Sequence, residues 1–159
     1  MSILIYLILG LLTSLLFPPY FFLPLGFIIF PSFCLLLDSN KENNSNLNIF
    51  KKFSIFGFGF FISYLFWVKN PFFVFEETKN FFLVFLVLII LLSVILSLIF
   101  TIILKLGKNI PIIFLIPFMF TSSEYIISLF FYGFPWFTFS LILSSNEYLL
   151  FSLKSFGTL

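Results

Sequence analysis

The sequence contains no alanine, arginine, histidine or glutamine, and it has a single cysteine, Cys34. One cysteine excludes an internal disulfide bond. The absence of histidine removes the commonest metal ligand and any Ser-His or Cys-His catalytic pair, so we expect neither a metal site nor a cofactor. The net charge of +2 is too small for a nucleic-acid-binding surface, so nucleic acid is not an expected partner.

Charged residues are also scarce, at 9% of the chain, whereas hydrophobic residues make up 62% and the mean hydropathy is +1.24. Soluble domains are about 45–50% apolar, so this composition predicts an integral membrane protein. Phenylalanine accounts for 30 of the 159 residues. With no alanine available, close contacts between membrane helices must use glycine and serine, and Gly57 and Gly59 mark a place where another backbone could approach.

Five apolar runs predict membrane-spanning helices in an all-α polytopic bundle. The predicted spans are residues 3–17, 23–37, 53–68, 81–104 and 110–132. The polar segments 38–52 and 69–80 are expected to be loops, and the second should dip into the membrane interface because it is rich in phenylalanine. Residues 137–155 are too polar for a span, so we expect an interfacial or re-entrant segment there. The last residues, 156–159, look like the start of another apolar run, so we expect the chain to be a truncated part of a larger bundle.

The positions of the lysines predict the orientation, because cytoplasmic loops carry an excess of positive charge. If Met1 is inside, the inside loops hold five lysines, namely Lys41, Lys51, Lys52, Lys105 and Lys108. The outside loop between the third and fourth spans holds only Lys69 and Lys79. We therefore expect a cytoplasmic N-terminus, with Pro18, Trp67 and Trp136 all on the outer face.

A rigid turn, Gly133-Phe134-Pro135-Trp136, ends the last predicted span. Proline cannot continue a helix, and tryptophan favours the membrane–water interface. The residues alone leave two interpretations open. The turn is either a plain helix stop with an interfacial anchor or the lip of a substrate site.

Glu124 is an ionisable residue inside the same predicted span. It lies eight residues before Tyr132, about 12 Å below the outer end at 1.5 Å per residue. Placing a carboxyl group at that depth costs free energy, so a functional role is the default hypothesis for Glu124. The alternative is a structural role, in which Glu124 hydrogen-bonds between helices. No group of residues has the spacing of a catalytic site, so we expect no catalytic residue in this chain.

Four blocks of the sequence stand out in order along the chain. They are Phe17-Pro18-Pro19-Tyr20 followed by Pro24, Gly57-Phe58-Gly59-Phe60-Phe61 with Ser63 and Trp67-Val68, Glu124 with Gly133-Phe134-Pro135-Trp136, and Ser155-Phe156-Gly157. Together they resemble apolipoprotein N-acyltransferase, a bacterial inner-membrane enzyme that completes lipoprotein acylation. The chain departs from that family at Ile127, where an arginine usually follows the acid, and at Leu23, where a tryptophan often precedes Pro24.

The resemblance implies that residues 1–159 are the N-terminal transmembrane domain of a two-part enzyme with a nitrilase-like domain on the outer, periplasmic face. The Glu-Lys-Cys triad of that second domain would move an acyl chain from a phospholipid to the N-terminal diacylglyceryl-cysteine of a lipoprotein. Cys34 matches no triad position, so we expect this chain alone to be inactive. The resemblance also implies a lipid groove lined by Tyr20, Trp67 and the turn that contains Phe134, Pro135 and Trp136, with Glu124 beneath it.

A function of a different class is also compatible with the residues. The chain could be a small non-enzymatic membrane subunit for transport or assembly that shares only the interfacial turns. A downstream coding sequence with well-spaced glutamate, lysine and cysteine would favour the enzyme over the subunit.

Overall fold

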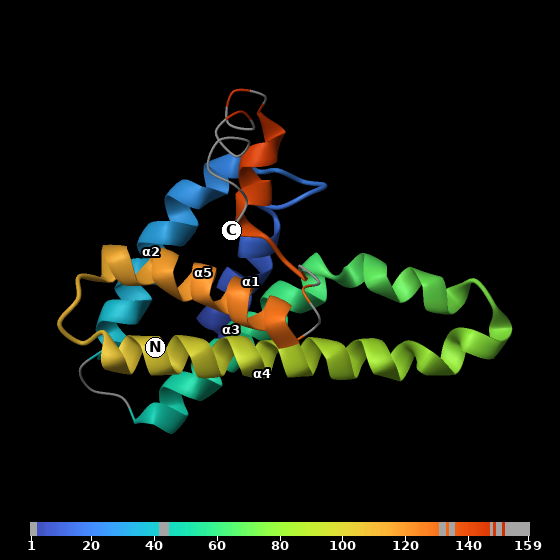
Figure 1. Cartoon of the computed structure of the whole chain (residues 1–159), viewed down its shortest axis with the longest axis horizontal. Coiled ribbons are helices and arrows are strands. Elements are labelled where there is room, and N and C mark those ends of the chain that lie inside the picture. The colour runs from blue at the N-terminus through green and yellow to red at the C-terminus, as the bar shows by residue number, and fades with distance from the viewer. Residues whose placement is uncertain are drawn as a thin grey trace.

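The computed structural model describes residues 3–41, 45–130, 133, 136–146, 148 and 151, and in this part of the chain every regular element is a helix (Figure 1). The α-helices are α1 (Ile3–Ser14), α2 (Gly26–Lys41), α3 (Asn46–Tyr64), α4 (Phe82–Leu106) and α5 (Ile112–Phe130). The 3₁₀ helices are η1 (Leu23–Leu25), η2 (Phe66–Phe73), η3 (Glu76–Phe81) and η4 (Phe139–Ser145). The all-helical fold class predicted from the apolar runs is confirmed.

Three helical segments of the described part are long and apolar enough to cross a membrane, namely Leu23–Lys41, Glu76–Leu106 and Ile112–Phe130. A fourth crossing results if α3 and η2 form one span, which bends by 52°. A polytopic membrane bundle is therefore confirmed. The 12 residues of α1 rise only about 18 Å, against roughly 30 Å of hydrocarbon, so the count of five spans stays a prediction.

Helix boundaries differ most from the predicted spans at α3, which begins at Asn46 instead of near Phe53. Ser45 caps this helix, because its side-chain oxygen accepts a hydrogen bond from the backbone N–H of Asn48 at 3.3 Å. Hydropathy finds the part of a helix that lipid can cover, whereas capping decides where the backbone becomes helical. The prediction of a loop over 38–52 is therefore wrong at both ends, which belong to α2 and α3.

A helical hairpin made of η2, η3 and the first turns of α4 extends beyond the rest of the bundle, in green at the right of Figure 1. The predicted loop 69–80 is thus mostly 3₁₀ helix. Phe73, Val74 and Phe75 are exposed at its tip. Exposed aromatic rings at the end of a membrane helix suit the interfacial layer, and contact of this tip with that layer stays a prediction.

Glycines let α3 lie directly against α1 and α4. A Cβ atom on Gly59 would stand 2.6 Å from the carbonyl oxygen of Leu7 in α1, and a Cβ on Gly57 would stand 3.1 Å from the Cα of Ser93 in α4. Small residues allow such backbone contact between membrane helices. The close approach predicted at these two glycines is confirmed.

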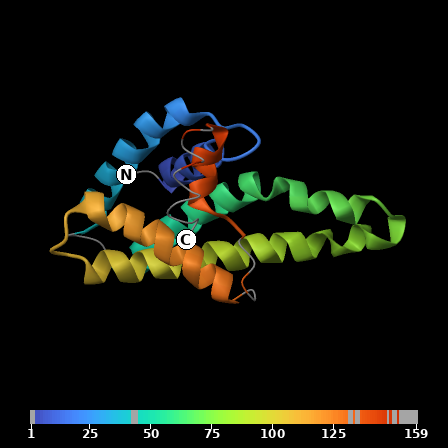
Figure 2. The same cartoon turned by 45° about the horizontal axis from the view of Figure 1, so that its top comes forward.

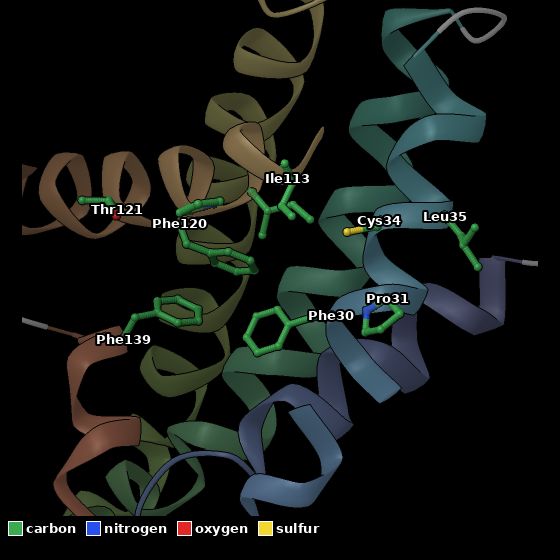
Figure 3. Close-up of a pocket in the computed structure, with 10 residues that line it drawn as sticks. Phe30, Pro31, Cys34, Leu35, Ile113, Phe120, Thr121 and Phe139 are labelled. Carbon is green, nitrogen blue, oxygen red and sulfur yellow. The ribbon is translucent and has the colours of Figure 1, made fainter. Parts of the chain in front are cut away.

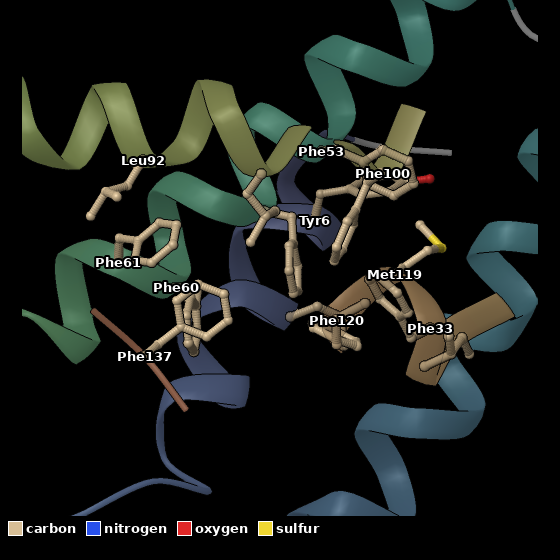
Figure 4. Packing of buried hydrophobic residues seen from close by; sticks show 14 of the residues in the cluster. Tyr6, Phe33, Phe53, Phe60, Phe61, Leu92, Phe100, Met119, Phe120 and Phe137 are labelled. Carbon is tan, nitrogen blue, oxygen red and sulfur yellow. The ribbon is translucent and has the colours of Figure 1, made fainter. Parts of the chain in front are cut away.

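Phenylalanine rings fill the centre of the bundle (Figure 4). Phe100 of α4 lies 5.4 Å from Phe53 of α3 and 5.1 Å from Phe120 of α5 between ring centroids, edge to face in both pairs. Phe33 of α2 lies 5.6 Å from Phe120. Such pairs contribute about 0.5–1.5 kcal/mol each beyond their burial. One aromatic core therefore joins four helices and fixes the relative positions of their ends.

The two ends of the bundle differ in chemistry. On one side, at the left of Figures 1 and 2, α2 and α4 end and α3 and α5 begin. We call this side the lysine end because it carries Lys41, Lys51, Lys52, Lys105 and Lys108. Two of these lysines tie the helices together there. Lys41 Nζ donates to the carbonyl oxygen of Ile110 at 2.6 Å, and Lys52 Nζ donates to Asn40 Oδ1 at 2.6 Å.

Candidate functional site

Tyr20 and Trp67, which are far apart in the sequence, line one pocket at the end of the bundle opposite the lysines. We call it the end pocket. Its volume is about 190 Å³. Its lining residues are Ser14, Pro18, Pro19, Tyr20, Ser63, Tyr64, Phe66, Trp67 and Asn70. The structure thus brings together the Pro-Pro turn and the Trp67 region, as expected if both face the same side of the membrane.

A turn and a helix bend form the walls of the end pocket. After α1, the backbone N–H groups of Tyr20 and Phe21 both donate to the carbonyl oxygen of Phe17 at 3.1 Å, which folds the chain back on itself. Phe21 has a φ of 48°, in the left-handed region that non-glycine residues seldom occupy. The other wall is the bend between α3 and η2, where Trp67 lies. Both aromatic side chains stay more than 60% exposed, at 62% and 64%.

Hydroxyl groups form the inner part of the pocket. The Ser14 and Ser63 hydroxyls hydrogen-bond to each other at 2.7 Å and so join α1 to α3. Asn70 adds an amide and Tyr64 a phenol to the lining. A site with an aromatic rim and a few hydrogen-bonding groups suits a ligand that has a polar group on an apolar body.

Glu124 is buried in α5, with 6% of its surface exposed. Its Oε2 accepts a hydrogen bond from the backbone N–H of Phe139 at 3.1 Å, and the side chain of Thr138 also interacts with this carboxyl group. Its Oε1 is buried and accepts no hydrogen bond from the described residues. Glu124 therefore ties α5 to the segment that follows the Gly133 turn, 15 residues along the chain.

Aromatic contacts connect Glu124 with the end pocket. The ring of Phe139 lies 5.2 Å from Phe17, the residue that starts the Pro-Pro turn. Phe17 in turn lies 4.9 Å from Tyr64, which lines the pocket. Packed aromatic rings therefore join the segment that Glu124 binds to the end pocket, and Glu124 lies on the inner side of that pocket.

The predicted turn at 133–136 is only partly described. Gly133 has a φ of +82° and donates its N–H to the carbonyl oxygen of Ser128 at 2.7 Å, which ends α5 with a glycine in the left-handed region. Phe134 and Pro135 lie outside the described residues. Trp136 packs against the hydrophobic core, next to the buried Phe137, and is not among the described lining residues of the end pocket.

Sequence reasoning gave no role in this site to Ser14, Tyr64, Asn70 or Phe139. Ser63 enters the sequence prediction only as part of a family-like block, although it is a polar residue in an apolar run and such a residue needs a partner in a membrane. That signal could have found the Ser14–Ser63 pair. Nothing in the sequence pairs the backbone N–H of Phe139 with Glu124, since backbone groups carry no residue-specific signal.

The chemistry that the site offers is hydrogen bonding and apolar contact. Among the residues that the structure describes, no three His, Cys, Asp or Glu side chains are grouped to hold a metal ion. Cys34 belongs to α2 and faces the space between α2 and α5, and it is not among the lining residues of the end pocket. The end pocket is thus a candidate binding site, and the described residues give it no nucleophile with an adjacent base.

Comparison with known proteins gives one family. The family model described as "Apolipoprotein N-acyltransferase N-terminal domain" matches residues 9–159, which include every lining residue of the end pocket and Glu124. No curated protein and no solved structure matches the chain.

Proposed function

The chain belongs to the family of apolipoprotein N-acyltransferase N-terminal domains, and on that premise we propose that it is the membrane part of an enzyme that moves an acyl chain from a phospholipid to a lipoprotein. The acceptor would be the N-terminal diacylglyceryl-cysteine of that lipoprotein. In this proposal the chemistry belongs to a nitrilase-like domain on the periplasmic side. The role of residues 1–159 is to receive and position lipids.

The observation that carries the proposal is the convergence of Tyr20 and Trp67 on one pocket with a polar interior. Both lipid substrates have polar groups at the membrane surface and acyl chains below it. A pocket at the end of the bundle, with an aromatic rim and hydroxyls from Ser14 and Ser63, is suited to hold the polar part of such a molecule.

The orientation is part of the proposal. We propose that the lysine end faces the cytoplasm and the end pocket the periplasm, because positive residues collect on the cytoplasmic side of membrane proteins. The grouping of five lysines on one side of the bundle, in the last turn of α2 and α4, the second turn of α3 and the loop between α4 and α5, supports this orientation. It would place Glu124 beneath a periplasmic lipid site in the inner membrane.

The proposal is tested with Trp67→Ala in the enzyme that contains this domain. Loss of one aromatic contact worth about 1.4 kcal/mol in the transition state should lower kcat/KM about tenfold. The matched control is Phe73→Ala, which removes an aromatic ring of similar exposure, 52%, from the hairpin tip. N-acylation of a diacylated lipopeptide is the measurement. Equal effects of the two substitutions on kcat/KM would refute a specific role for the pocket.

We also propose that the turn from Gly133 to Trp136, including Phe134 and Pro135, forms the lip of the lipid site. Trp136 packs against the core, so its removal should act through the position of the turn. Trp136→Ala is expected to lower turnover while membrane insertion is unchanged. Unaltered turnover would leave the turn as a helix stop with an interfacial anchor.

A further inference from the structure

A wide apolar groove lies between α2 and α5 (Figure 3). We call it the α2–α5 groove. Its volume is about 840 Å³, and its walls include Phe30 and Cys34 of α2, Ile113, Pro117 and Phe120 of α5, and Phe139 of η4. In Figure 3, Phe30 and Cys34 point from α2 toward the α5 side of the groove. It shares no described lining residue with the end pocket.

Packed rings hold the floor of the groove in place. Phe120 lies 5.6 Å from Phe33 and 5.1 Å from Phe100, both of which are at most 2% exposed. At one end, Phe139 closes the groove against Phe120 with a ring-centroid distance of 4.3 Å. These contacts keep the rings from folding into the groove, so its shape is preformed.

The surroundings of the groove decide what fills it. Both of its walls belong to candidate membrane spans, Leu23–Lys41 and Ile112–Phe130, so the groove lies at the depth of the hydrocarbon when these helices cross the membrane. Leu35 and Ile113 at its edges are 70% and 69% exposed and continue the lipid-facing surface of their helices. Water is disfavoured between such walls, and an empty groove would leave them without contacts.

We propose that the α2–α5 groove binds one acyl chain of a membrane phospholipid. The groove volume falls within the roughly 300–1,000 Å³ of small-molecule sites. Its lining is continuous with the exposed apolar surface of α2 and α5, so an acyl chain can enter sideways without crossing a polar layer. The proposal requires only that the chain spans a membrane and does not depend on acyl transfer.

An acyl chain in the groove would also contact the segment that hydrogen-bonds to Glu124. The ring of Phe139 closes the groove, and the backbone N–H of the same residue donates to Glu124 Oε2. An acyl chain packed on that ring therefore stabilises the position of the residue that Glu124 binds.

The test is photocrosslinking of the full chain in vesicles of phosphatidylethanolamine and phosphatidylglycerol, doped with a phosphatidylethanolamine that carries a diazirine on its acyl chain. Leu98 and Ile102 of α4 are the reference positions, because they are apolar and 48% and 55% exposed without lining the groove. Labelling at Cys34 and Pro117 should exceed labelling at these references severalfold. Cys34→Trp fills the groove and should lower labelling on α5 about tenfold, as expected for the loss of about 1.4 kcal/mol of binding free energy.

Cys34→Ser is the matched control, since it changes the thiol without filling the groove, and it should label like the unmodified chain. The labelling pattern of the unmodified chain tests the proposal even if Cys34→Trp does not fold. Labelling of α4 without labelling of the groove would mean that protein covers the groove. Equal labelling of the groove and the references, unaffected by Cys34→Trp, would mean ordinary lipid contact. Either result would overturn the proposal.

Discussion

Glu124 gives the sharpest test of how the site is held together. Its Oε2 accepts the Phe139 N–H at 3.1 Å, and this hydrogen bond, together with the interaction of the Thr138 side chain, links α5 to the segment after the Gly133 turn. Glu124→Leu removes the acceptor and leaves that N–H without its partner. A buried donor left unsatisfied costs about 1–3 kcal/mol. The population in which the segment leaves α5 should therefore increase about 5- to 150-fold.

Glu124→Gln is the matched variant. Glutamine has nearly the same shape, and its carbonyl oxygen can accept the Phe139 N–H, so the segment should stay in place. Global stability is an ambiguous measurement here, because removing a buried acid and adding apolar contact both offset the lost hydrogen bond. The measurement must therefore report on the segment itself.

Trp136 lies three residues before Phe139, so its fluorescence reports on the position of the segment. The chain has two tryptophans, so in a Trp67→Phe background all the tryptophan fluorescence comes from Trp136. With Glu124→Leu we expect a red-shifted emission maximum and stronger quenching by acrylamide, and with Glu124→Gln neither change. If both variants match the parent, the carboxyl group does not hold the segment. If both shift equally, the charge rather than the hydrogen bond is responsible.

Two further predictions concern packing and orientation. Gly59→Leu should destabilise the bundle by about 1–3 kcal/mol, because the new side chain meets the backbone carbonyl of Leu7. Gly26→Ala should be nearly neutral, because its Cβ meets only side chains, at 3.5 Å or more. Denaturation in detergent micelles, followed by circular dichroism, compares the two variants. Orientation is tested with single cysteines in a background in which the native cysteine is serine. Lys108→Cys should react with a membrane-impermeant thiol reagent only from the cytoplasmic side, and Thr78→Cys only from the periplasmic side. The reverse pattern would show that the proposed orientation is inverted.

The large features of the fold were accessible from sequence because they follow from composition along the chain. Apolar length predicted the membrane helices, and the lack of alanine pointed to Gly57 and Gly59 as sites of backbone contact. Hydropathy predicted a wrong helix start where a segment carries polar residues and is helical nonetheless. Residues 46–52 include two asparagines and two lysines yet are helical, because Ser45 caps α3 and Lys52 finds a hydrogen-bond partner in Asn40.

The site could be predicted only in part. Tyr20 and Trp67 carry chemical signals of their own, since aromatic residues beside prolines or at a span end indicate the interface, and the structure brings them together. Trp136 carries the same signal, yet it packs against the core. A signal of residue type places a side chain near the surface of the membrane. It does not say which neighbour it meets.

The sequence by itself determined that this chain is a helical membrane protein and which family it belongs to, because both follow from residue types and their order. Tertiary structure alone decided that Ser14 meets Ser63, that Glu124 binds a backbone N–H, and that α2 and α5 stand apart around an apolar groove. These features depend on the angles and distances at which helices pack. Many sequences with the same hydropathy pattern would pack differently, since the position of a few glycines and rings sets those angles.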